Sequence, residues 1–198
     1  MKTKRILLAV IIIAILVAID QYTKYLVVTN MQPYSDEKKI IGDSLVLYFI
    51  KNTGAAWGSF SKNTPVLAGI SVVMIIFLGY LFFKNIERDD RKLLRIFTII
   101  TIGGAVGNLI DRIRLNYVVD FIYAKFINFP VFNFADICVT VSAFMLVILY
   151  IFIYKDDEEE SKITSKINES STEENDTDSD EESHEEETEI ESETQDIF

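Results

Sequence analysis

Four long apolar segments constrain this chain more than any other feature of its sequence. A helix needs roughly 20 residues to cross the hydrocarbon core of a bilayer. In lipid the backbone must satisfy its own hydrogen bonds, so apolar segments of that length form helices. The sequence therefore predicts an all-α membrane protein with four transmembrane helices, at about residues 6–28, 65–83, 93–113 and 134–154.

The first segment starts as a secretory signal peptide does, with the basic residues Lys2, Lys4 and Arg5 ahead of an apolar run. No small-x-small cleavage site precedes Asp20, and three further apolar segments follow. We therefore expect the first helix to remain in the protein.

The distribution of lysine and arginine indicates which side of the membrane each segment faces, because cytoplasmic segments carry more of them. The N-terminus and the short stretch 84–95 are both basic. The bias is incomplete, since the loops 29–64 and 114–133 also carry basic residues. We predict that both termini are cytoplasmic and that these two loops face outward. Leu45–Ile50 is rich in β-forming residues, which favours a strand or a small sheet in the first loop.

The last part of the chain differs sharply in composition from the rest. Residues 155–198 carry 3 Lys and 20 Asp or Glu, whereas residues 1–154 carry 16 Lys or Arg and 10 Asp or Glu. A segment so charged and so poor in apolar residues cannot bury enough surface to offset the entropy of ordering. We expect residues 1–155 to form the four-span domain and residues 156–198 to be a disordered acidic cytoplasmic tail.

The chain has one cysteine, Cys138, and one histidine, His184. An internal disulfide is therefore impossible, and a Cys/His zinc site would lack ligands. Nucleophile pairs of the Ser-His or Cys-His type lack a plausible base. Any chemistry must come from carboxylates, amides, hydroxyls, lysine or arginine.

Ionisable residues gather where the predicted helices reach the outward side. Such residues are costly near lipid and are usually functional. They are Asp20, Asp111, Arg112, Asp120 and Asp136. For any one of them a helix cap or an interfacial anchor is an equally good explanation, but several converging on one side indicate a polar site.

Asparagines join this group at helical spacing. Asn108, Asp111 and Arg112 stand at positions i, i+3 and i+4, so they share one face of a helix. Asn133 and Asp136 repeat the i, i+3 relation, although both residue types also suit a helix N-cap.

Two other local patterns have structural explanations. Asp20 and Lys24, at i and i+4, are explained by a simple ion pair. Gly103 and Gly107 have the small-residue spacing that lets membrane helices approach closely. We therefore expect close helix packing around these glycines.

Two neighbouring carboxylates suit this set of side chains, because like charges close together share one proton. One carboxylate then acts as general base on a water, while the protonated partner polarises a peptide carbonyl. Asp120 and Asp136 flank the second outward loop and are candidates for such a pair. The sequence does not show that they meet.

Five motifs occur in an order that resembles one family, lipoprotein signal peptidase (signal peptidase II), the bacterial intramembrane aspartyl peptidase. The resemblance covers roughly residues 5–154, and five motifs in the family's order make it specific. The acidic tail lies outside it. The motifs are Asp20-Gln21-Tyr22-Thr23-Lys24, Asn52 to Gly58, Gly103 to Arg112, Val118-Val119-Asp120-Phe121 and Phe132-Asn133-Phe134-Ala135-Asp136.

The resemblance implies that Asp120 and Asp136 are the catalytic pair. The substrate would be a prolipoprotein that carries diacylglycerol on its lipobox cysteine, and cleavage just before that cysteine would release the signal peptide. The family uses no metal or other cofactor and is blocked by globomycin. Residues 29–64 would form a small extramembrane cradle. Supporting or substrate-binding roles are implied for Asp20, Asn52, Asn108, Asp111, Arg112 and Asn133.

We further expect a monomer in the bacterial cell membrane, in contact with lipid, without a nucleic-acid partner and with its active site near the outer face. Three alternatives stay open on the residues alone. A small transporter would use the intramembrane Asp and Arg residues along a substrate path. A Ser-Lys peptidase would use Ser59 or Ser61 with Lys51 or Lys62. A non-catalytic scaffold would tolerate Asp-to-Asn changes throughout.

Overall fold

The structure is a computed structural model that describes residues 2–35, 37–54 and 63–154. The predicted acidic tail, 156–198, lies outside the described residues. Residues 55–62 also lie outside them, and these include Trp57 and Lys62 as well as Ser59 and Ser61 of the Ser-Lys alternative.

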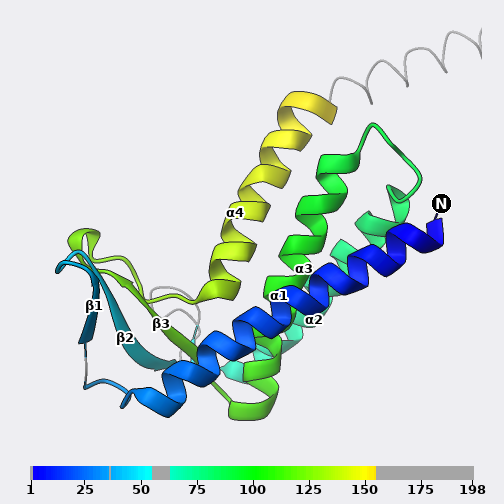
Figure 1. The fold of residues 1–198 in the computed structure, drawn as a ribbon. Coiled ribbons are helices and arrows are strands. Elements are labelled where there is room, and N and C mark those ends of the chain that lie inside the picture. Colours follow the sequence, from blue (N-terminus) through cyan, green and yellow to red (C-terminus); the bar gives the residue numbers. More distant parts are fainter. Residues whose placement is uncertain (1, 36, 55–62, 155–198) are drawn as a thin grey trace, which may run out of the picture. The chain divides into compact units, whose positions relative to one another are not determined.

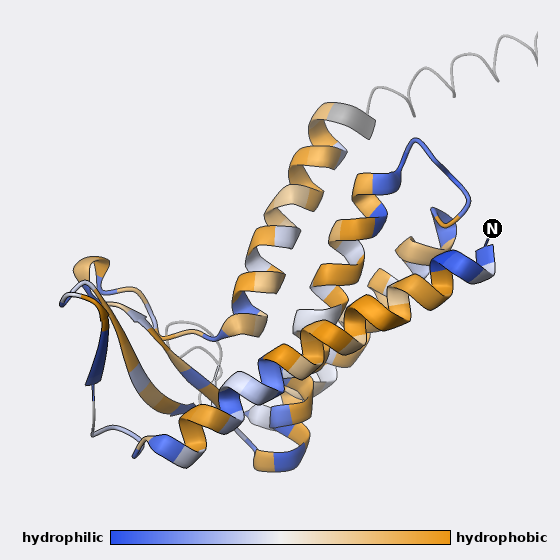
Figure 2. Cartoon of the chain, in the orientation of Figure 1, coloured by the Kyte–Doolittle hydropathy of each residue, from blue (hydrophilic) through white to orange (hydrophobic). Residues whose placement is uncertain are grey.

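Four helices in the described residues are long and apolar enough to cross a membrane, which confirms the predicted fold class (Figure 1). Three of them are α1 (Lys2–Asn30), α2 (Thr64–Lys84) and α3 (Lys92–Leu115). The fourth spans Phe134–Phe152, of which α4 is Phe134–Leu149. Figure 2 shows that their middle parts are mostly apolar, whereas the loop between α2 and α3 is hydrophilic. Large apolar side chains remain exposed on α1 and α2, as expected of helices that face lipid. Tyr150–Tyr154 form a separate π-helical segment.

α3 is the central helix of the bundle, because it packs against α1, α2 and α4. Its glycines make these contacts close. A Cβ atom at Gly103 would lie 2.8 Å from Leu16 Cδ1, and one at Gly107 would lie 2.5 Å from Asp20 Oδ2. The close packing predicted from the spacing of the two glycines is therefore confirmed.

A three-stranded antiparallel sheet lies at one end of the helices, in the order β1 (Glu37–Ile41), β2 (Leu45–Asn52), β3 (Val118–Ala124) (Figure 1). The first two strands confirm the small sheet expected in the first loop. The third strand was not expected, although residues 118–123 are rich in β-forming types. Pairing of β2 with β3 sets Ile50 opposite Asp120 and brings Asn52 beside it.

The segment after β3 folds back on that strand. A short 3-10 helix, η2 (Lys125–Ile127), makes the turn. Phe132 then pairs with Ile122: its N–H donates to the Ile122 carbonyl at 3.0 Å, and its carbonyl accepts from the Ile122 N–H at 2.8 Å. This return delivers Asn133 and the start of α4 next to β3.

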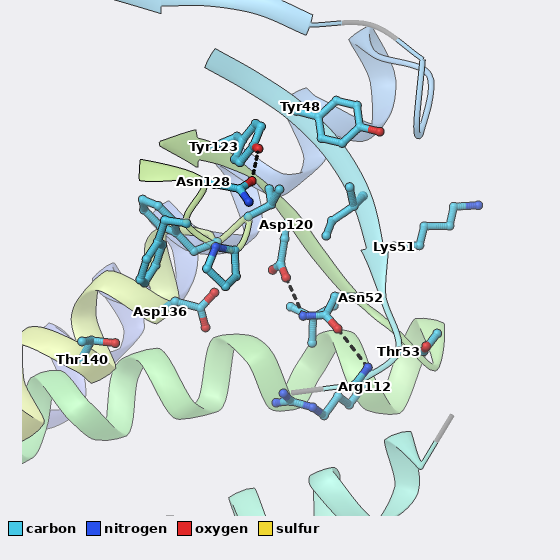
Figure 3. Close-up of a pocket in the computed structure, with 17 residues that line it drawn as sticks. Tyr48, Lys51, Asn52, Thr53, Arg112, Asp120, Tyr123, Asn128, Asp136 and Thr140 are labelled. Carbon is cyan, nitrogen blue, oxygen red and sulfur yellow. Dashed lines mark hydrogen bonds between the residues drawn. The ribbon is translucent and has the colours of Figure 1, made fainter. Parts of the chain in front are cut away.

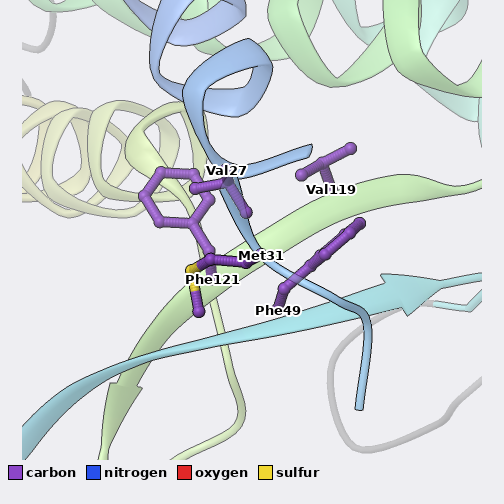
Figure 4. Packing of buried hydrophobic residues seen from close by; sticks show 5 residues of the cluster. All are labelled: Val27, Met31, Phe49, Val119 and Phe121. Carbon is purple, nitrogen blue, oxygen red and sulfur yellow. The ribbon is translucent and has the colours of Figure 1, made fainter. Parts of the chain in front are cut away.

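The last turns of α1 hold the sheet in place. α1 continues beyond Asp20, so that Val27 and the following Met31 pack on Phe49 of β2 and on Val119 and Phe121 of β3 (Figure 4). Successive side chains in a strand point to opposite faces. Because Val119 and Phe121 face this cluster, Asp120 between them faces the other way, where α3 and α4 meet the sheet.

The opposite end of the bundle is fixed by arginines. Arg5 Nη1 donates to the Ile86 carbonyl at 2.6 Å, and Arg95 Nη1 donates to the Asn85 carbonyl at 3.1 Å. Ile86 also belongs to a hydrophobic cluster with Ala9, Phe82 and Ile99. The turn between α2 and α3 is thereby tied to α1 and α3.

Candidate active site

Asp120 is almost completely buried, with 1% of its surface exposed, yet both of its carboxylate oxygens have donors. Asn52 Nδ2 donates to Oδ2 at 2.8 Å, and Asn133 Nδ2 donates to Oδ1 at 2.7 Å. Burial and the neighbouring Asp136 carboxylate raise the pKa of Asp120 to about 7, against the lowering effect of the two amides and of Lys24. Asp120 is therefore poised to exchange a proton near neutral pH.

Asp136 is held by the first turn of α4. The Asn133 N–H donates to Asp136 Oδ2 at 3.0 Å, and the Asp136 N–H donates to Asn133 Oδ1 at 2.9 Å. This reciprocal arrangement is a capping box, which satisfies N–H groups that a helix start leaves unpaired. The second oxygen, Oδ1, accepts from Asn108 Nδ2 of α3 at 2.7 Å. Asn133 is thus both the cap of α4 and a donor to Asp120.

A cavity of about 800 Å³ opens beside these groups, and both carboxylates line it (Figure 3). Figure 3 shows Asp120 from the sheet and Asp136 from α4 entering the space from different sides, with Arg112 of α3 across from them. Arg112 Nη1 lies 3.5 Å from Ser71 Oγ, and its buried Nε has no hydrogen-bond partner among the described residues. The cavity is further lined by Tyr48, Tyr123, Phe129, Pro130, Val131 and Phe132.

A buried ion cluster lies behind the two carboxylates. Lys24 is 3% exposed, and its Nζ lies 2.9 Å from Asp20 Oδ2 and 3.0 Å from Asp111 Oδ2. The expected pair of Asp20 and Lys24 is present, but the lysine also makes a third bond, to Asn108 Oδ1 at 2.8 Å. Gln21 Nε2 adds a hydrogen bond to Asp111 Oδ1 at 3.0 Å.

The two acids of this cluster also fix backbone at the site. Asp20 Oδ1 accepts from the Ala135 N–H at the start of α4, at 3.1 Å. Asp111 Oδ2 accepts from the Val119 N–H of β3, at 3.1 Å. Each acid thus ties its own helix to an element that carries one of the two carboxylates.

The structure brings all the sequence-predicted candidates together. One network of hydrogen bonds and ion pairs joins seven of them, with Lys24 linking the two acids of the ion cluster to Asn108: Asp20, Asn52, Asn108, Asp111, Asp120, Asn133 and Asp136. Arg112 lines the cavity beside them. Sequence reasoning left out Lys24 and Gln21 as site residues. The i, i+4 spacing from Asp20 was the available signal for Lys24, but a local pair explained it completely. Among the described residues, no group of His, Cys, Asp and Glu has the arrangement of a metal site.

The fold and site together define a multi-pass membrane protein in which two carboxylates from different elements face one open cavity. A family profile described as signal peptidase (SPase) II, Peptidase_A8, matches residues 12–152. The chain belongs to this family and is a membrane peptidase. The transporter and scaffold alternatives therefore lose their support.

Curated relatives and solved structures agree with this assignment. The "Lipoprotein signal peptidase" of Moorella thermoacetica is 40% identical over 69% of this chain and 88% of its own length. That of Lactococcus lactis subsp. cremoris is 41% identical over 77% of this chain and 97% of its own length. A solved structure described as a bacterial membrane enzyme has a TM-score of 0.65 and 30% identity, covering 72% of this chain and 87% of that one.

Proposed function

We propose that this chain is an aspartic endopeptidase that removes signal peptides from prolipoproteins carrying diacylglycerol on the lipobox cysteine. Cleavage falls at the peptide bond just before that cysteine, and Asp120 and Asp136 perform the chemistry. The observation that carries the proposal is the common cavity into which both carboxylates open, each with two N–H donors. The names of the curated relatives supply the substrate class.

The two carboxylates hold one proton between them when a peptide enters. The ionised carboxylate takes a proton from water as the water oxygen attacks the carbonyl carbon, and the protonated partner gives its proton to the carbonyl oxygen. The C–N bond then breaks as the leaving nitrogen receives the proton taken from water. The carbonyl re-forms and returns its proton to the second carboxylate. The pKa of Asp120, about 7, supports one retained proton near neutral pH.

The remaining residues support this pair. Asn52 and Asn133 orient Asp120 through its two oxygens, and Asn108 orients Asp136. Asp20 and Asp111 hold the starts of α4 and β3 against α1 and α3. Arg112 presents its guanidinium to the cavity and is suited to bind carbonyl oxygens of the substrate. The mixed apolar and aromatic lining suits a peptide that arrives from lipid.

We also propose that both termini are cytoplasmic and that the cavity opens near the outer face of the membrane. Basic residues at the end opposite the sheet, among them Lys2, Arg5 and Arg88, support this orientation. A membrane-impermeant thiol reagent applied to intact cells tests it. Phe126→Cys is expected to react and Glu87→Cys is not, and the reverse pattern would contradict the orientation.

The proposed reaction is tested by a gel-shift assay with purified protein and a diacylglyceryl-modified prolipoprotein. Wild type is expected to release the signal peptide, while Asp120→Asn and Asp136→Asn accumulate in the membrane without cleaving it. Asp43→Asn is the matched control, because Asp43 lies in the turn between β1 and β2 with 80% of its side chain exposed. Normal cleavage by either site variant would contradict the assignment of Asp120 and Asp136 as the catalytic pair. Absence of cleavage by folded wild type would contradict the proposed peptidase reaction itself.

A further inference from the structure

The Lys24 ammonium has three N–H groups and three acceptors, of which only two are charged. Asp20 and Asp111 are the ion partners, at 2.9 and 3.0 Å, and the Asn108 amide oxygen is the third acceptor, at 2.8 Å. An ammonium buried this deeply is stable only when it is paired and fully hydrogen-bonded. The two acids already provide the pairing, so the third bond is directed at a neutral side chain that itself contacts the site.

The Asn108 amide has two different ends, and its neighbours determine which way it faces. Its oxygen accepts from Lys24 Nζ and from Asn133 Nδ2 at 3.0 Å, while its nitrogen donates to Asp136 Oδ1 at 2.7 Å. If the amide were turned over, its NH₂ would face the ammonium and another NH₂, and its oxygen would face a carboxylate. The positive charge of Lys24 therefore favours the orientation in which Asp136 receives a donor.

Asn133 needs no such help. Its oxygen accepts from the Asp136 N–H as part of the α4 cap, which leaves its nitrogen free to donate to Asp120. The donor to Asp120 is thus oriented by a helix terminus. The Asn108 donor to Asp136 is oriented by a buried cation on a different helix, together with the Asn133 NH₂.

We propose that Lys24 is a positioning residue for the reaction: its ammonium holds the Asn108 amide in the orientation that presents Nδ2 to Asp136. Lys24 is absent from the lining of the cavity, so it acts through Asn108 and not on the substrate. This inference rests on the proposed aspartic mechanism. A purely structural account would instead give Lys24 the single task of neutralising Asp20 and Asp111.

The two accounts separate when the charge of the cluster is restored without the lysine. Asp20, Lys24 and Asp111 together carry one negative charge, and D20N/K24M carries the same charge because only Asp111 remains ionised. Wild type and D20N/K24M therefore have the same cluster charge, and D20N, whose cluster is neutral, is measured beside them to give the cost of Asp20→Asn alone. Lys125→Met is the matched control, since Lys125 is a half-exposed lysine of η2 that pairs with Glu37 of β1 at 2.8 Å.

The measurements are kcat, KM and the pH profile of cleavage, taken on monodisperse detergent-solubilised protein whose thermal unfolding is followed in parallel. D20N/K24M is expected to keep the KM of D20N and to lose about tenfold to hundredfold in kcat, the scale of a hydrogen bond to a charged group. Its acid limb should move to higher pH, because the lost cation no longer favours the ionised pair. The other charges that face the pair are unchanged between the two variants: Asp111 and Arg112 on α3. Lys125→Met should match wild type.

Equal kcat and an unmoved pH profile in D20N and D20N/K24M would overturn the inference and leave the peptidase reaction intact. Absence of cleavage by wild type would overturn both. If D20N/K24M does not yield monodisperse protein, the triple variant D20N/D111N/K24M, whose cluster is neutral, is compared with D20N/D111N by the same measurements. Equal kcat in that pair likewise refutes the role of Lys24.

Discussion

Gly104 is the point at which the packing of α3 controls the position of Asp136. A Cβ atom there would lie 2.5 Å from the carbonyl oxygen of Ala135, 2.9 Å from Val139 Cγ2 and 3.0 Å from Cys138 Cβ. All three atoms belong to the start of α4. Because the nearest atom is backbone, Gly104→Ala is relieved only by moving the first turn of α4, and an ordinary contact of 3.4 Å requires about 0.9 Å of movement.

Two effects of Gly104→Ala follow from that displacement. Overpacking of a tight interior costs about 1–3 kcal/mol, so the thermal unfolding temperature falls. The moved turn carries Asn133 and Asp136, and misplacing a reacting group by about 1 Å costs on the order of a hundredfold in rate. Thermal unfolding in detergent measures the first effect, and kcat in the gel-shift assay measures the second.

The chain supplies two matched controls for this substitution. Gly79 of α2 has no atom within 4 Å of its would-be Cβ, so Gly79→Ala should leave kcat unchanged and stabilise slightly, by about 0.4–1 kcal/mol. Gly103 faces the flexible tip of Leu16, at 2.8 Å, so Gly103→Ala should cost less than Gly104→Ala. If Gly104→Ala unfolds at the same temperature as Gly79→Ala and cleaves at the same rate, the packing argument is wrong.

The other predictions concern Asp120 and Asn133. Because the pKa of Asp120 rises from 3.8 to about 7 on folding, the folded state holds a proton that the unfolded state has lost, so wild-type stability should decline as pH rises from about 4 to 7. Asp120→Asn should remove most of that slope in thermal unfolding measured across pH, and an unchanged slope would refute the pKa assignment. Asn133→Ser keeps a capping side chain but loses the amide donor to Asp120 and Asn108, so kcat should fall at least about tenfold. Asn133→Ala also loses the cap and should be about 1 kcal/mol less stable than Asn133→Ser. Equal stabilities of the two Asn133 variants would show that the cap is unimportant.

Hydropathy predicted the four helices because a bilayer demands a long apolar segment, which is a local property of the sequence. β3 was missed although residues 118–123 are rich in β-forming types, as residues 45–50 are. The sequence could not show which strand it pairs with, because its partner β2 lies more than sixty residues earlier in the chain.

In the candidate site too, local groupings could be predicted from the sequence and long-range contacts could not. Asn108 and Asp111, or Asn133 and Asp136, could be grouped from the sequence because each pair lies within one turn of a helix. The role proposed for Lys24 depends on Asn108, 84 residues away, and the spacing from Asp20 already gave the lysine a sufficient local partner. Because the i, i+4 pair with Asp20 already explained Lys24, the sequence offered no reason to look for its distant contact with Asn108.

The bonds that orient the two carboxylates are also the bonds that build the fold. Asn133 and Asp136 cap α4 through their own side chains, Asp111 holds the first residues of β3, and Asp20 holds the start of α4. Alanine substitutions at these positions therefore remove support for the fold and for the chemistry at once, and loss of cleavage alone cannot assign a role. Two variants separate these roles. Asn133→Ser keeps a capping side chain and removes the amide donor to Asp120 and Asn108. D20N/K24M restores the wild-type charge of the ion cluster without the orienting cation, with D20N as its control. A site assembled from helix caps and interhelical ion pairs needs no dedicated scaffold, because closing the bundle against the sheet is what brings Asp120 and Asp136 to the same cavity.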